Sequence, residues 1–273
     1  RVPHSLAQTI DTCGTGGAPK TFNVSTAAAL IAAAAGANVA KHGNRSRTGR
    51  GSAEILMALG VNVDATPEVQ GLCLEQAGIC FSFAIHHHPA MKYAIGPRKS
   101  LGFPTIFNVL GPLTNPAGAT RQLIGVYRRE LMRPVAEALQ HLGAERAMVV
   151  HSEDGLDELS TTAPTHAAIL ENGEVELTTI DARALGIEPP AGGLPDLQAS
   201  DIDDAQRRIE GVLAGEAKFS SERAMACLNA GAALFIAGVS TDLAGGYEAA
   251  GAAIDAGRTM DTLAKLVTAS QGI

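Results

Sequence analysis

The sequence has few cysteines, little charge and no long basic run, and each shortage excludes a class of protein. Four cysteines in 273 residues are too few for a disulfide-built scaffold, so a reducing cytoplasm is the expected location. The net charge of −7, from 21 Lys and Arg against 28 Asp and Glu, argues against a surface that binds nucleic acid through its phosphates.

No segment indicates a membrane span or a signal peptide. The first residues, Arg1-Val2-Pro3-His4, contain no signal-like apolar segment. The most apolar stretch, residues 27–40, is mostly alanine and contains Gly36 and Asn38, so it is too short and too weakly apolar to cross a bilayer. Apolar residues make up 46% of the chain and charged residues 18%, which is enough for a sizeable buried core. The composition therefore predicts a soluble cytoplasmic protein and favours an enzyme.

Short apolar runs alternate with helical patterns over the first part of the chain. Strands are predicted at residues 37–41, 79–83, 122–127 and 147–151, and helices at 26–35, 52–59, 66–78 and 130–142. Such alternation favours an α/β fold with a mixed, largely parallel central sheet flanked by helices.

The pattern changes after residue 165. Asn172-Gly173 lies between two apolar runs and predicts a β-hairpin of residues 165–170 and 174–180. Helical patterns follow at 201–213, 220–237, 243–256 and 259–270. The length suits one large domain or two modest ones, and we expect one α/β domain over residues 1–273 with a helical C-terminal part.

A glycine-rich segment suits phosphate binding. It reads Asp11-Thr12-Cys13-Gly14-Thr15-Gly16-Gly17 and is followed by Asn23-Val24-Ser25-Thr26 at a predicted helix start. Glycines let the backbone N–H groups approach a ligand, and the helix N-terminus and hydroxyls add donors. The spacing fits neither a Walker loop nor a Rossmann fingerprint. The alternative is an ordinary strand-to-helix turn.

A basic segment, Lys41-His42-Gly43-Asn44-Arg45, comes directly after residues 37–40 of a predicted strand. Ligands in open α/β sheets bind at the carboxyl ends of strands, so this segment is expected to face the glycine-rich one. Lys41 and Arg45 suit polyanions, and the Asn44 amide both donates and accepts hydrogen bonds. The alternative is a solvated basic turn at the sheet edge.

Asp157 and Glu158 follow the strand predicted at 147–151. Mg²⁺ commonly takes one or two carboxylates and shares the oxygens of a substrate phosphate, so this pair suits a metal site beside a phosphate cradle. The alternative is a solvated acidic loop.

Three other features are interpreted as structural. The side chains of the neighbouring residues His86-His87-His88 point apart, so they are not expected to bind one metal, and Cys73 and Cys80 are expected to be core residues. Residues 108–116 are interpreted as a rigid turn that frames the site.

Taken together, these segments resemble the anthranilate phosphoribosyltransferases. The matching segments are Gly14-Thr15-Gly16-Gly17, Asn23-Val24-Ser25-Thr26, Lys41-His42-Gly43-Asn44-Arg45, Gly51-Ser52-Ala53-Glu54, His88-Pro89-Ala90-Met91-Lys92, Arg98-Lys99, residues 105–116 and Gly155-Leu156-Asp157-Glu158. They occur in family order over most of residues 9–160, and Leu228-Asn229-Ala230 in the helical tail also fits.

The resemblance implies a reaction in tryptophan biosynthesis in which phosphoribosyl pyrophosphate and anthranilate give phosphoribosyl-anthranilate and pyrophosphate, with Mg²⁺. It assigns Gly14, Gly17, Thr21, Asn23, Ser25, Thr26, Lys41 and Ser52 to phosphoribosyl pyrophosphate. It assigns Gly14, His42, Asn44 and Arg98 to anthranilate, and Ser25, Asp157 and Glu158 to the metal. Lys41 and Arg98 are the residues expected to serve catalysis most directly.

The reaction implied by the resemblance needs little general acid–base catalysis. Mg²⁺, Lys41 and backbone N–H groups can stabilise the departing pyrophosphate. The ribosyl centre becomes oxocarbenium-like, so a weak aromatic amine suffices once Arg98 holds the anthranilate carboxylate in place. We therefore expect catalysis by positioning and electrostatics.

The sequence departs from the family in three places. The helices that open family members, and that complete a small helical domain and the homodimer contact, are mostly missing, and residues 86–120 are expected to form the remnant of that domain and its hinge. Family members continue the glycine segment with Asp-Gly, whereas Gly17 here precedes Ala18-Pro19-Lys20, and the 46–50 loop is one residue short.

Two alternatives belong to other functional classes. A pyrimidine nucleoside phosphorylase of the same fold would carry a Ser where His42-Gly43 stands, and it needs neither Arg98 nor the Asp157-Glu158 pair. A non-catalytic nucleic-acid-binding relative conflicts with the net charge of −7.

Overall fold

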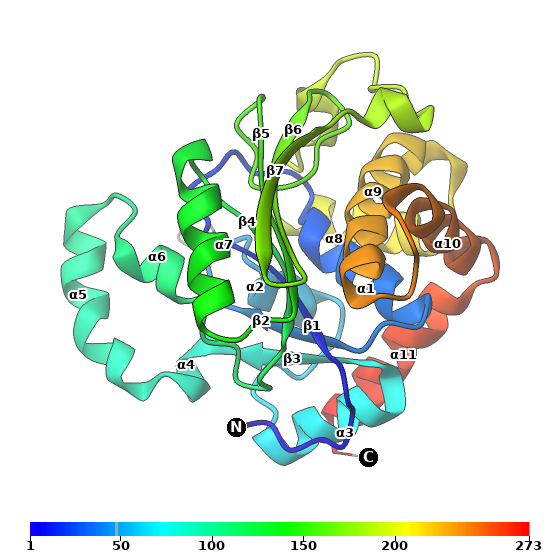
Figure 1. Ribbon diagram of the computed structural model, residues 1–273. Helices are drawn as coiled ribbons and strands as arrows, with labels where there is room; N and C mark the ends of the chain where they lie inside the picture. Colours follow the sequence, from blue (N-terminus) through cyan, green and yellow to red (C-terminus); the bar gives the residue numbers. More distant parts are fainter. Residues whose placement is uncertain (47–48, 273) are drawn as a thin grey trace.

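The computed structural model describes residues 1–46 and 49–272, and its centre is a seven-stranded sheet (Figure 1). The strands are β1 (Ile10–Gly14), β2 (Val39–Gly43), β3 (Ile79–Phe83), β4 (Arg121–Gly125), β5 (Arg146–Ser152), β6 (Thr165–Glu171) and β7 (Glu174–Ile180), in the order β3-β2-β1-β4-β5-β6-β7. The first five in this order are parallel, and β6 and β7 are antiparallel. The predicted mixed, largely parallel sheet is confirmed.

Helices cover both faces of the sheet. They are α1 (Val24–Ala34), α2 (Ser52–Ala58), α3 (Pro67–Ala77), α4 (Ala84–His87), α5 (Lys92–Leu101), α6 (Ile106–Leu110), α7 (Met132–His141), α8 (Ile202–Leu213), α9 (Ser220–Ala237), α10 (Leu243–Asp255) and α11 (Arg258–Ser270). Short 3₁₀ helices are Pro89–Met91, Arg129–Leu131, Ala182–Leu185, Leu194–Leu197 and Ala217–Phe219. In Figure 1, α7 packs on one face against β5 to β7, and α1 and α9 pack on the other. Among the described residues, no helix combines the length and apolar character that a membrane span requires.

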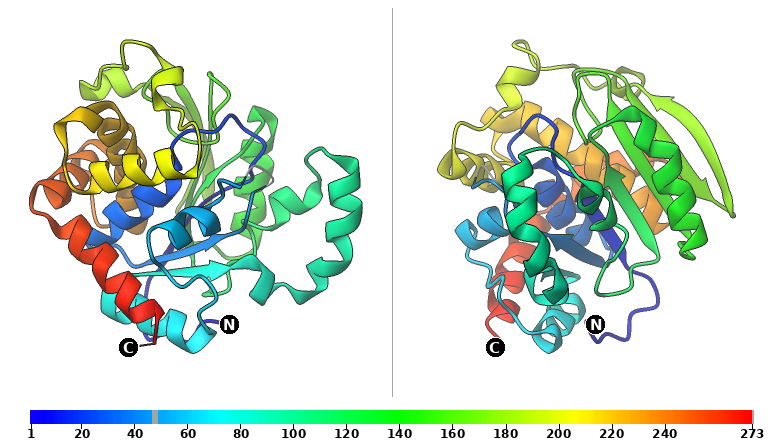
Figure 2. Two further views of the ribbon diagram at one scale, coloured as in Figure 1. Left: turned by 180° about the vertical axis from the view of Figure 1, so that it is seen from behind. Right: turned by 90° about the vertical axis from the view of Figure 1, so that its left-hand side faces the viewer.

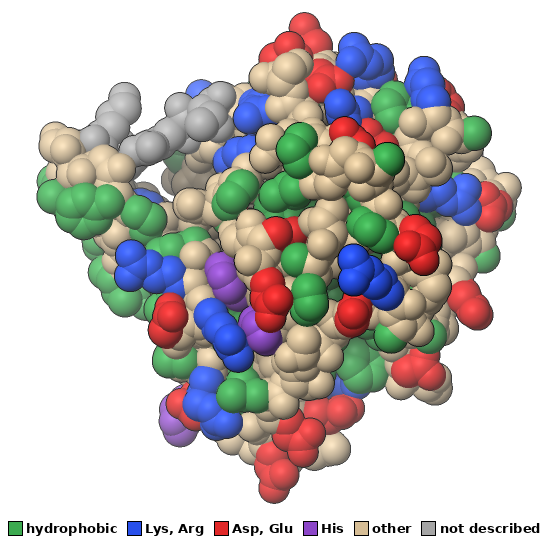
Figure 3. Space-filling model, turned by 90° about the horizontal axis from the view of Figure 1, so that it is seen from above, with side chains coloured by type: hydrophobic (Ala, Val, Ile, Leu, Met, Phe, Trp, Pro, Cys, Tyr) green, Lys and Arg blue, Asp and Glu red, His purple; other side chains and the backbone are tan. Residues whose placement is uncertain are grey.

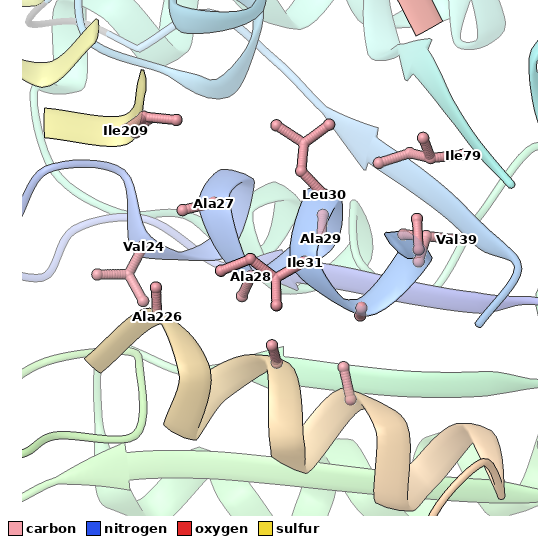
Figure 4. Close-up of a cluster of buried hydrophobic side chains, with 14 of the residues drawn as sticks. Val24, Ala27, Ala28, Ala29, Leu30, Ile31, Val39, Ile79, Ile209 and Ala226 are labelled. Atoms are coloured by element: carbon pink, nitrogen blue, oxygen red, sulfur yellow. The ribbon is translucent and has the colours of Figure 1, made fainter. Parts of the chain in front are cut away.

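The main core is built around α1, which is buried on every side. Its small side chains let the sheet and helices α8 to α11 pack closely around it, so it is apolar all round rather than amphipathic. Figure 4 shows Val24 facing Ala226 of α9, while Leu30 points toward Ile79 of β3. This packing fixes the N-terminus of α1 at one end of the sheet, close to the glycine-rich segment.

Most predicted elements are confirmed, and three segments differ from the prediction in ways that matter for the site. Residues 39–43 form β2, so Lys41 and His42 belong to a strand and do not follow one. The first part of the glycine-rich segment is β1, a strand that the pattern did not predict because Asp11 and Thr12 are polar; both are buried. Residues 108–116 also differ from the predicted rigid turn, because Asn108 lies inside α6.

The sheet topology creates a crevice. From β1 the chain continues to β2 and β3 on one side, and it returns to place β4 on the other side of β1. Ligands bind at such a switch point, outside the carboxyl ends of the strands. Gly14 of β1 and Gly125 of β4 are register partners at this end.

Helices α5 and α6 project from the body on the side away from α11, as Figure 1 and the left panel of Figure 2 show. This arm, from α5 to α6, exposes the large apolar side chains of Tyr93, Leu101, Phe103, Ile106, Phe107 and Leu110, and Ile85 on α4 is exposed as well. Apolar side chains also gather at the left edge of the surface in Figure 3.

Candidate active site

The turn after β1 crosses the carboxyl end of β4. Thr15 N–H donates to the Gly125 carbonyl at 2.9 Å, and the Tyr127 N–H donates to Thr15 Oγ1 at 3.1 Å. Gly16 and Gly17 follow with φ values of 64° and 99°, a region that favours glycine. The turn is therefore fixed at its start by β4, and its glycines bring the backbone to the rim of the crevice. Figure 3 views this end of the molecule, where acidic and basic side chains are interspersed.

Asp157 lies directly over the two glycines that end β1 and β4. A Cβ on Gly125 would lie 1.6 Å from the Asp157 carbonyl oxygen, and a Cβ on Gly14 would lie 2.6 Å from Asp157 Oδ2. The same Oδ2 accepts a hydrogen bond from Gly16 N–H at 3.2 Å. Burial raises the pKa of the Asp157 carboxyl above its usual value. Only glycine at both strand ends lets this carboxylate come so close.

Glu158 connects the acidic loop to the start of α1. Its Oε2 accepts from Thr21 Oγ1 at 3.0 Å, and its Oε1 accepts from Ser25 N–H at 3.3 Å. Burial, and next the charge of Asp157, raise the pKa of Glu158 to about 7. Ser25 lies in the first turn of α1, where free N–H groups favour anions. The donors predicted for phosphate therefore contact carboxylate oxygens.

Lys41 lies under this cluster and is only 2% exposed. Its Nζ donates to the Thr12 carbonyl at 2.6 Å, to the Ser25 carbonyl at 3.3 Å and to Ser25 Oγ at 3.4 Å. Burial lowers the pKa of Lys41, against the opposing effect of the Asp11 charge. Its ammonium group thus reaches the site from inside the protein, at Ser25.

Asp11 and Asn115 support the site, and the sequence analysis named them only as members of the glycine-rich and framing segments, with no role of their own. Asp11 is fully buried; its Oδ1 accepts from the His42 N–H at 3.0 Å and its Oδ2 accepts from Asn115 Nδ2 at 2.8 Å. Asn115 Nδ2 also donates to the Ala40 carbonyl at 2.8 Å. Burial raises the pKa of Asp11 to about 6. These contacts hold β2 in place around Lys41 and His42, and a sequence separation of 104 residues hides them from local patterns.

The His42 ring lies beside that of His88, with centroids 5.2 Å apart. His42 Nε2 is buried without a hydrogen-bond partner among the described residues. Burial, and next the neighbouring His88, lower the pKa of His42 to about 4, so the ring is neutral at neutral pH. Asn44 is exposed at the end of the strand, where its backbone carbonyl accepts from Ser52 Oγ at 3.5 Å.

Arg98 on α5 is linked to the glycine turn through Asn108. Its Nη2 donates to Asn108 Oδ1 at 3.3 Å, and Asn108 Nδ2 donates to the Thr15 carbonyl at 3.0 Å. The guanidinium also lies 5.6 Å from the centre of the Phe107 ring. A planar cation beside an aromatic ring suits a flat aromatic carboxylate. Asn108, a residue of the segment interpreted as a framing turn, is the bridge.

The predicted residues fall into two groups. The structure brings together Gly14, Thr21, Ser25, Lys41, Asp157 and Glu158 around the first turn of α1. Around the crevice, His42 lies on β2, Asn44 directly after it, Ser52 on α2 and Arg98 on α5. In the described part of the chain, Asn44 and Arg98 do not contact each other. Asn23 precedes α1 in a left-handed conformation, with its Nδ2 donating to the Arg50 carbonyl at 3.1 Å. Thr26 Oγ1 is buried and unpartnered among the described residues.

The acidic pair fits Mg²⁺ only with help from a substrate. Asp157 and Glu158 supply carboxylate oxygens, and Ser25 supplies a hydroxyl beside them. Within residues 1–46 and 49–272, no group of three His, Cys, Asp or Glu side chains forms a complete metal-ligand set. Mg²⁺ characteristically takes one or two carboxylates together with phosphate oxygens, so this donor set agrees with a metal that arrives with a polyphosphate.

Two loop segments differ from the family sequence, and the structure describes one of them completely and the other in part. The segment Gly17-Ala18-Pro19 is described, and a Cβ at Gly17 would lie 3.3 Å from Pro104 Cγ, so this turn contacts the base of the helical arm. In the short 46–50 loop, residues 47 and 48 lie outside the described residues.

Comparisons with known proteins agree with this geometry. The family described as "Glycosyl transferase family, a/b domain" matches residues 6–260. The anthranilate phosphoribosyltransferase of Thioalkalivibrio sulfidiphilus is 47% identical over 270 residues, which cover 98% of this chain and 79% of the relative. That of Methylobacillus flagellatus is 46% identical over 267 residues, covering 96% and 76%.

Solved structures give the same result. The crystal structure of anthranilate phosphoribosyltransferase from Thermus thermophilus matches with a TM-score of 0.91 and 37% identity, over 98% of this chain and 79% of that one. The Saccharomyces cerevisiae enzyme in complex with phosphoribosyl pyrophosphate and Mg matches with a TM-score of 0.87 and 25% identity, over 100% of this chain and 76% of that one. The chain therefore belongs to the anthranilate phosphoribosyltransferase family of glycosyl transferases.

Proposed function

We propose that this protein transfers the phosphoribosyl group of phosphoribosyl pyrophosphate to the amine of anthranilate, giving N-(5-phosphoribosyl)-anthranilate and pyrophosphate in tryptophan biosynthesis. One observation carries the proposal: phosphate donors and a pair of carboxylates meet at the switch point of the sheet. Gly16 N–H, Thr21 Oγ1 and Ser25 N–H all contact Asp157 or Glu158. The 47% identity to a protein of that name supports the choice of substrates.

Mg²⁺ is the cofactor that this site would take. Asp157, Glu158 and the Ser25 hydroxyl would hold it, and when bound it neutralises charge on the pyrophosphate. Glu158, whose pKa is about 7, would lose its proton when it takes this role.

The first turn of α1 and the glycine turn would bind phosphoribosyl pyrophosphate. We assign Gly14, Gly17, Thr21, Asn23, Ser25, Thr26, Lys41 and Ser52 to this substrate. Lys41 would act from beneath, because its ammonium group contacts Ser25 and is shielded from water. A buried cation stabilises developing negative charge more strongly than an exposed one.

Anthranilate would lie between the glycine turn and the helical arm. Arg98 would hold its carboxylate, Phe107 would lie beside its ring, and Gly14, His42 and Asn44 would surround its amine side. His42 is neutral at neutral pH, so its unpartnered Nε2 can accept a hydrogen bond from the amine. Substrate placement, rather than a strong general base, would produce most of the rate.

We also propose that the protein works in the cytoplasm as a homodimer, with residues 86–120 acting as hinge and remnant of a small helical domain. The apolar arm on α5 and α6 supports a protein contact there, because monomers rarely leave such a cluster in water. All four cysteines are free thiols, which agrees with a reducing compartment.

The test is the loss of anthranilate fluorescence on mixing with phosphoribosyl pyrophosphate and Mg²⁺. Turnover that Arg98→Ala removes, while binding of phosphoribosyl pyrophosphate is retained, would support the reaction and the carboxylate contact. A folded protein that converts uridine and inorganic phosphate instead would show the pyrimidine phosphorylase activity and overturn the proposal.

A further inference from the structure

Asn229 on α9 holds the residue that follows the acidic pair. Its Oδ1 accepts a hydrogen bond from the Leu159 N–H at 2.9 Å, and its Nδ2 donates to the Leu159 carbonyl at 2.8 Å. Nδ2 also donates to the Met225 carbonyl, one turn earlier in α9, at 2.9 Å. One side chain therefore pairs with both backbone groups of Leu159 and is itself fixed to its own helix. Asn229 is 4% exposed and Leu159 is fully buried.

The contact between Asn229 and Leu159 lies directly beside Glu158 in the chain. Glu158 contacts Thr21 and Ser25 at the start of α1, and the next residue, Leu159, is held by α9. Helices α1 and α9 pack directly on one another, with Val24 facing Ala226 in Figure 4. Since Ala226 and Asn229 are three residues apart, they lie on the same face of α9. The Glu158–Leu159 segment thus bridges two packed helices.

The loop keeps its shape by contacts of its own. Asp154 Oδ2 accepts from Ser160 Oγ at 2.6 Å, and Asp154 Oδ1 accepts from the Leu156 N–H at 3.4 Å. These bonds close the loop on itself and do not attach it to the helices. Glu158 attaches the loop to α1, and Asn229 attaches it to α9. Asn229 also lines a small cavity together with Ser25, Asp157 and Glu158.

We propose that Asn229 is a positioning residue for the metal-binding carboxylates, setting where Asp157 and Glu158 stand relative to the first turn of α1. The inference rests on the proposed function. Residues behind a metal's ligands commonly change metal affinity by about 10–100-fold when removed. We expect the Asn229→Ala variant to need about tenfold more Mg²⁺ for half-maximal rate at saturating substrates, and excess Mg²⁺ to restore most of the rate.

The matched control is Thr259→Val on α11. Thr259 is fully buried and its Oγ1 donates to the Leu213 carbonyl at 2.6 Å, so this change also removes a buried side-chain-to-backbone hydrogen bond, but away from the acidic loop. We expect it to lower the melting temperature as Asn229→Ala does, with no change in the Mg²⁺ requirement. Asn229→Asp is a second, isosteric variant, which keeps the acceptor for Leu159 N–H and places a carboxylate against two carbonyls.

Calorimetric binding of phosphoribosyl pyrophosphate at several Mg²⁺ concentrations, without anthranilate, gives a readout that needs no turnover. The expected result is that both Asn229 variants need about tenfold more Mg²⁺ for half-maximal binding of phosphoribosyl pyrophosphate, and that Thr259→Val does not. Folded Asn229 variants with the Mg²⁺ dependence of the unmodified protein would overturn the role of Asn229. An unmodified protein that binds phosphoribosyl pyrophosphate with Mg²⁺ but turns over no anthranilate would overturn the proposed function alone, because the binding data would still decide the role of Asn229.

Discussion

Adding one methyl group at Gly125 should disable the site. The Cβ of an alanine there would lie 1.6 Å from the Asp157 carbonyl oxygen and 2.5 Å from its carbonyl carbon, and ordinary contact begins at 3.4 Å. The obstacle is backbone, so no rotamer change relieves it, and the Asp157 peptide must move by about 1.8 Å. A misplacement of about 1 Å can cost about 100-fold in rate, so we expect kcat/KM of Gly125→Ala to fall at least about 100-fold.

The stability of the fold should suffer less than the activity. Overpacking of this kind typically costs about 1–3 kcal/mol, which a domain with a large core tolerates. We expect Gly125→Ala to remain folded with a lower melting temperature. Gly14→Ala should be milder, because its Cβ would meet the end of the flexible Asp157 side chain, at 2.6 Å from Oδ2.

Gly251→Ala on α10 is the control for these glycine variants. Its added Cβ would have its nearest contact at 3.6 Å, from Arg223 Nη2, and alanine favours a helix, so stability and activity should be kept or slightly improved. Fluorescence assays of anthranilate consumption with thermal melts on all three variants complete the test. A folded Gly125→Ala with kcat/KM within about threefold of the unmodified protein would refute the claim that these glycines set the position of Asp157.

Three further results are expected. Arg98→Ala should raise KM for anthranilate about 10–100-fold in steady-state assays and leave KM for phosphoribosyl pyrophosphate unchanged, with Arg98→Lys intermediate; equal effects on both substrates would contradict a carboxylate contact. Because Glu158 has a pKa of about 7 and must be deprotonated to bind metal, calorimetric Mg²⁺ affinity should rise as pH increases from about 6 to about 8, and Glu158→Gln should remove that dependence. Lys41→Met, nearly isosteric, should lower kcat about 100-fold or more with little change in fold, as circular dichroism would show; an unchanged kcat would rule out the buried charge as a source of catalysis.

The effect of pH on stability through Glu158 is the opposite of that of most carboxylates, whose pKa falls on folding. Its pKa is raised from 4.5 to about 7 in the folded protein, so the folded state holds the proton more tightly than the unfolded chain. Stability from this group is therefore present below about pH 4.5 and is lost as pH rises through about 7. A rise in melting temperature from about pH 5 to about pH 7 that Glu158→Gln abolishes would contradict this sign.

Local sequence patterns predicted the elements of the fold better than their ends. The strand at 79–83 and the helix at 220–237 have the predicted bounds, because apolar periodicity and glycines mark them clearly. Strand β1 was missed because its buried residues include Asp11 and Thr12, which resemble a loop in sequence. Their burial becomes favourable only when distant partners such as Asn115 supply hydrogen bonds.

Contacts between residues distant in sequence also limited the prediction of the site. The glycine turn, the basic segment and the acidic pair could be proposed because each consists of neighbouring residues. Asn108, Asn115 and Asn229 connect these segments through contacts across 93, 104 and 70 residues. Their segments matched the family, but the local sequence did not show which residues these side chains contact. Asparagine fits this task because one amide can donate and accept at once, so it pairs with a backbone peptide as another strand would.

The contacts of the acidic pair also explain why metal and substrate should bind together. Gly16 N–H, Thr21 Oγ1 and Ser25 N–H are the donors that a phosphate would use, and Asp157 and Glu158 accept from all three. If a phosphate bound without the metal, it would have to bind donors that Asp157 and Glu158 already occupy. Its negative charge and theirs would repel strongly in a partly buried site. Mg²⁺ would neutralise charge here, and Asp157 and Glu158 would hold it, which would leave the Gly16, Thr21 and Ser25 donors to the phosphate. The raised pKa of Glu158 fits this exchange, since a partly protonated carboxyl leaves its donors more readily than a full anion.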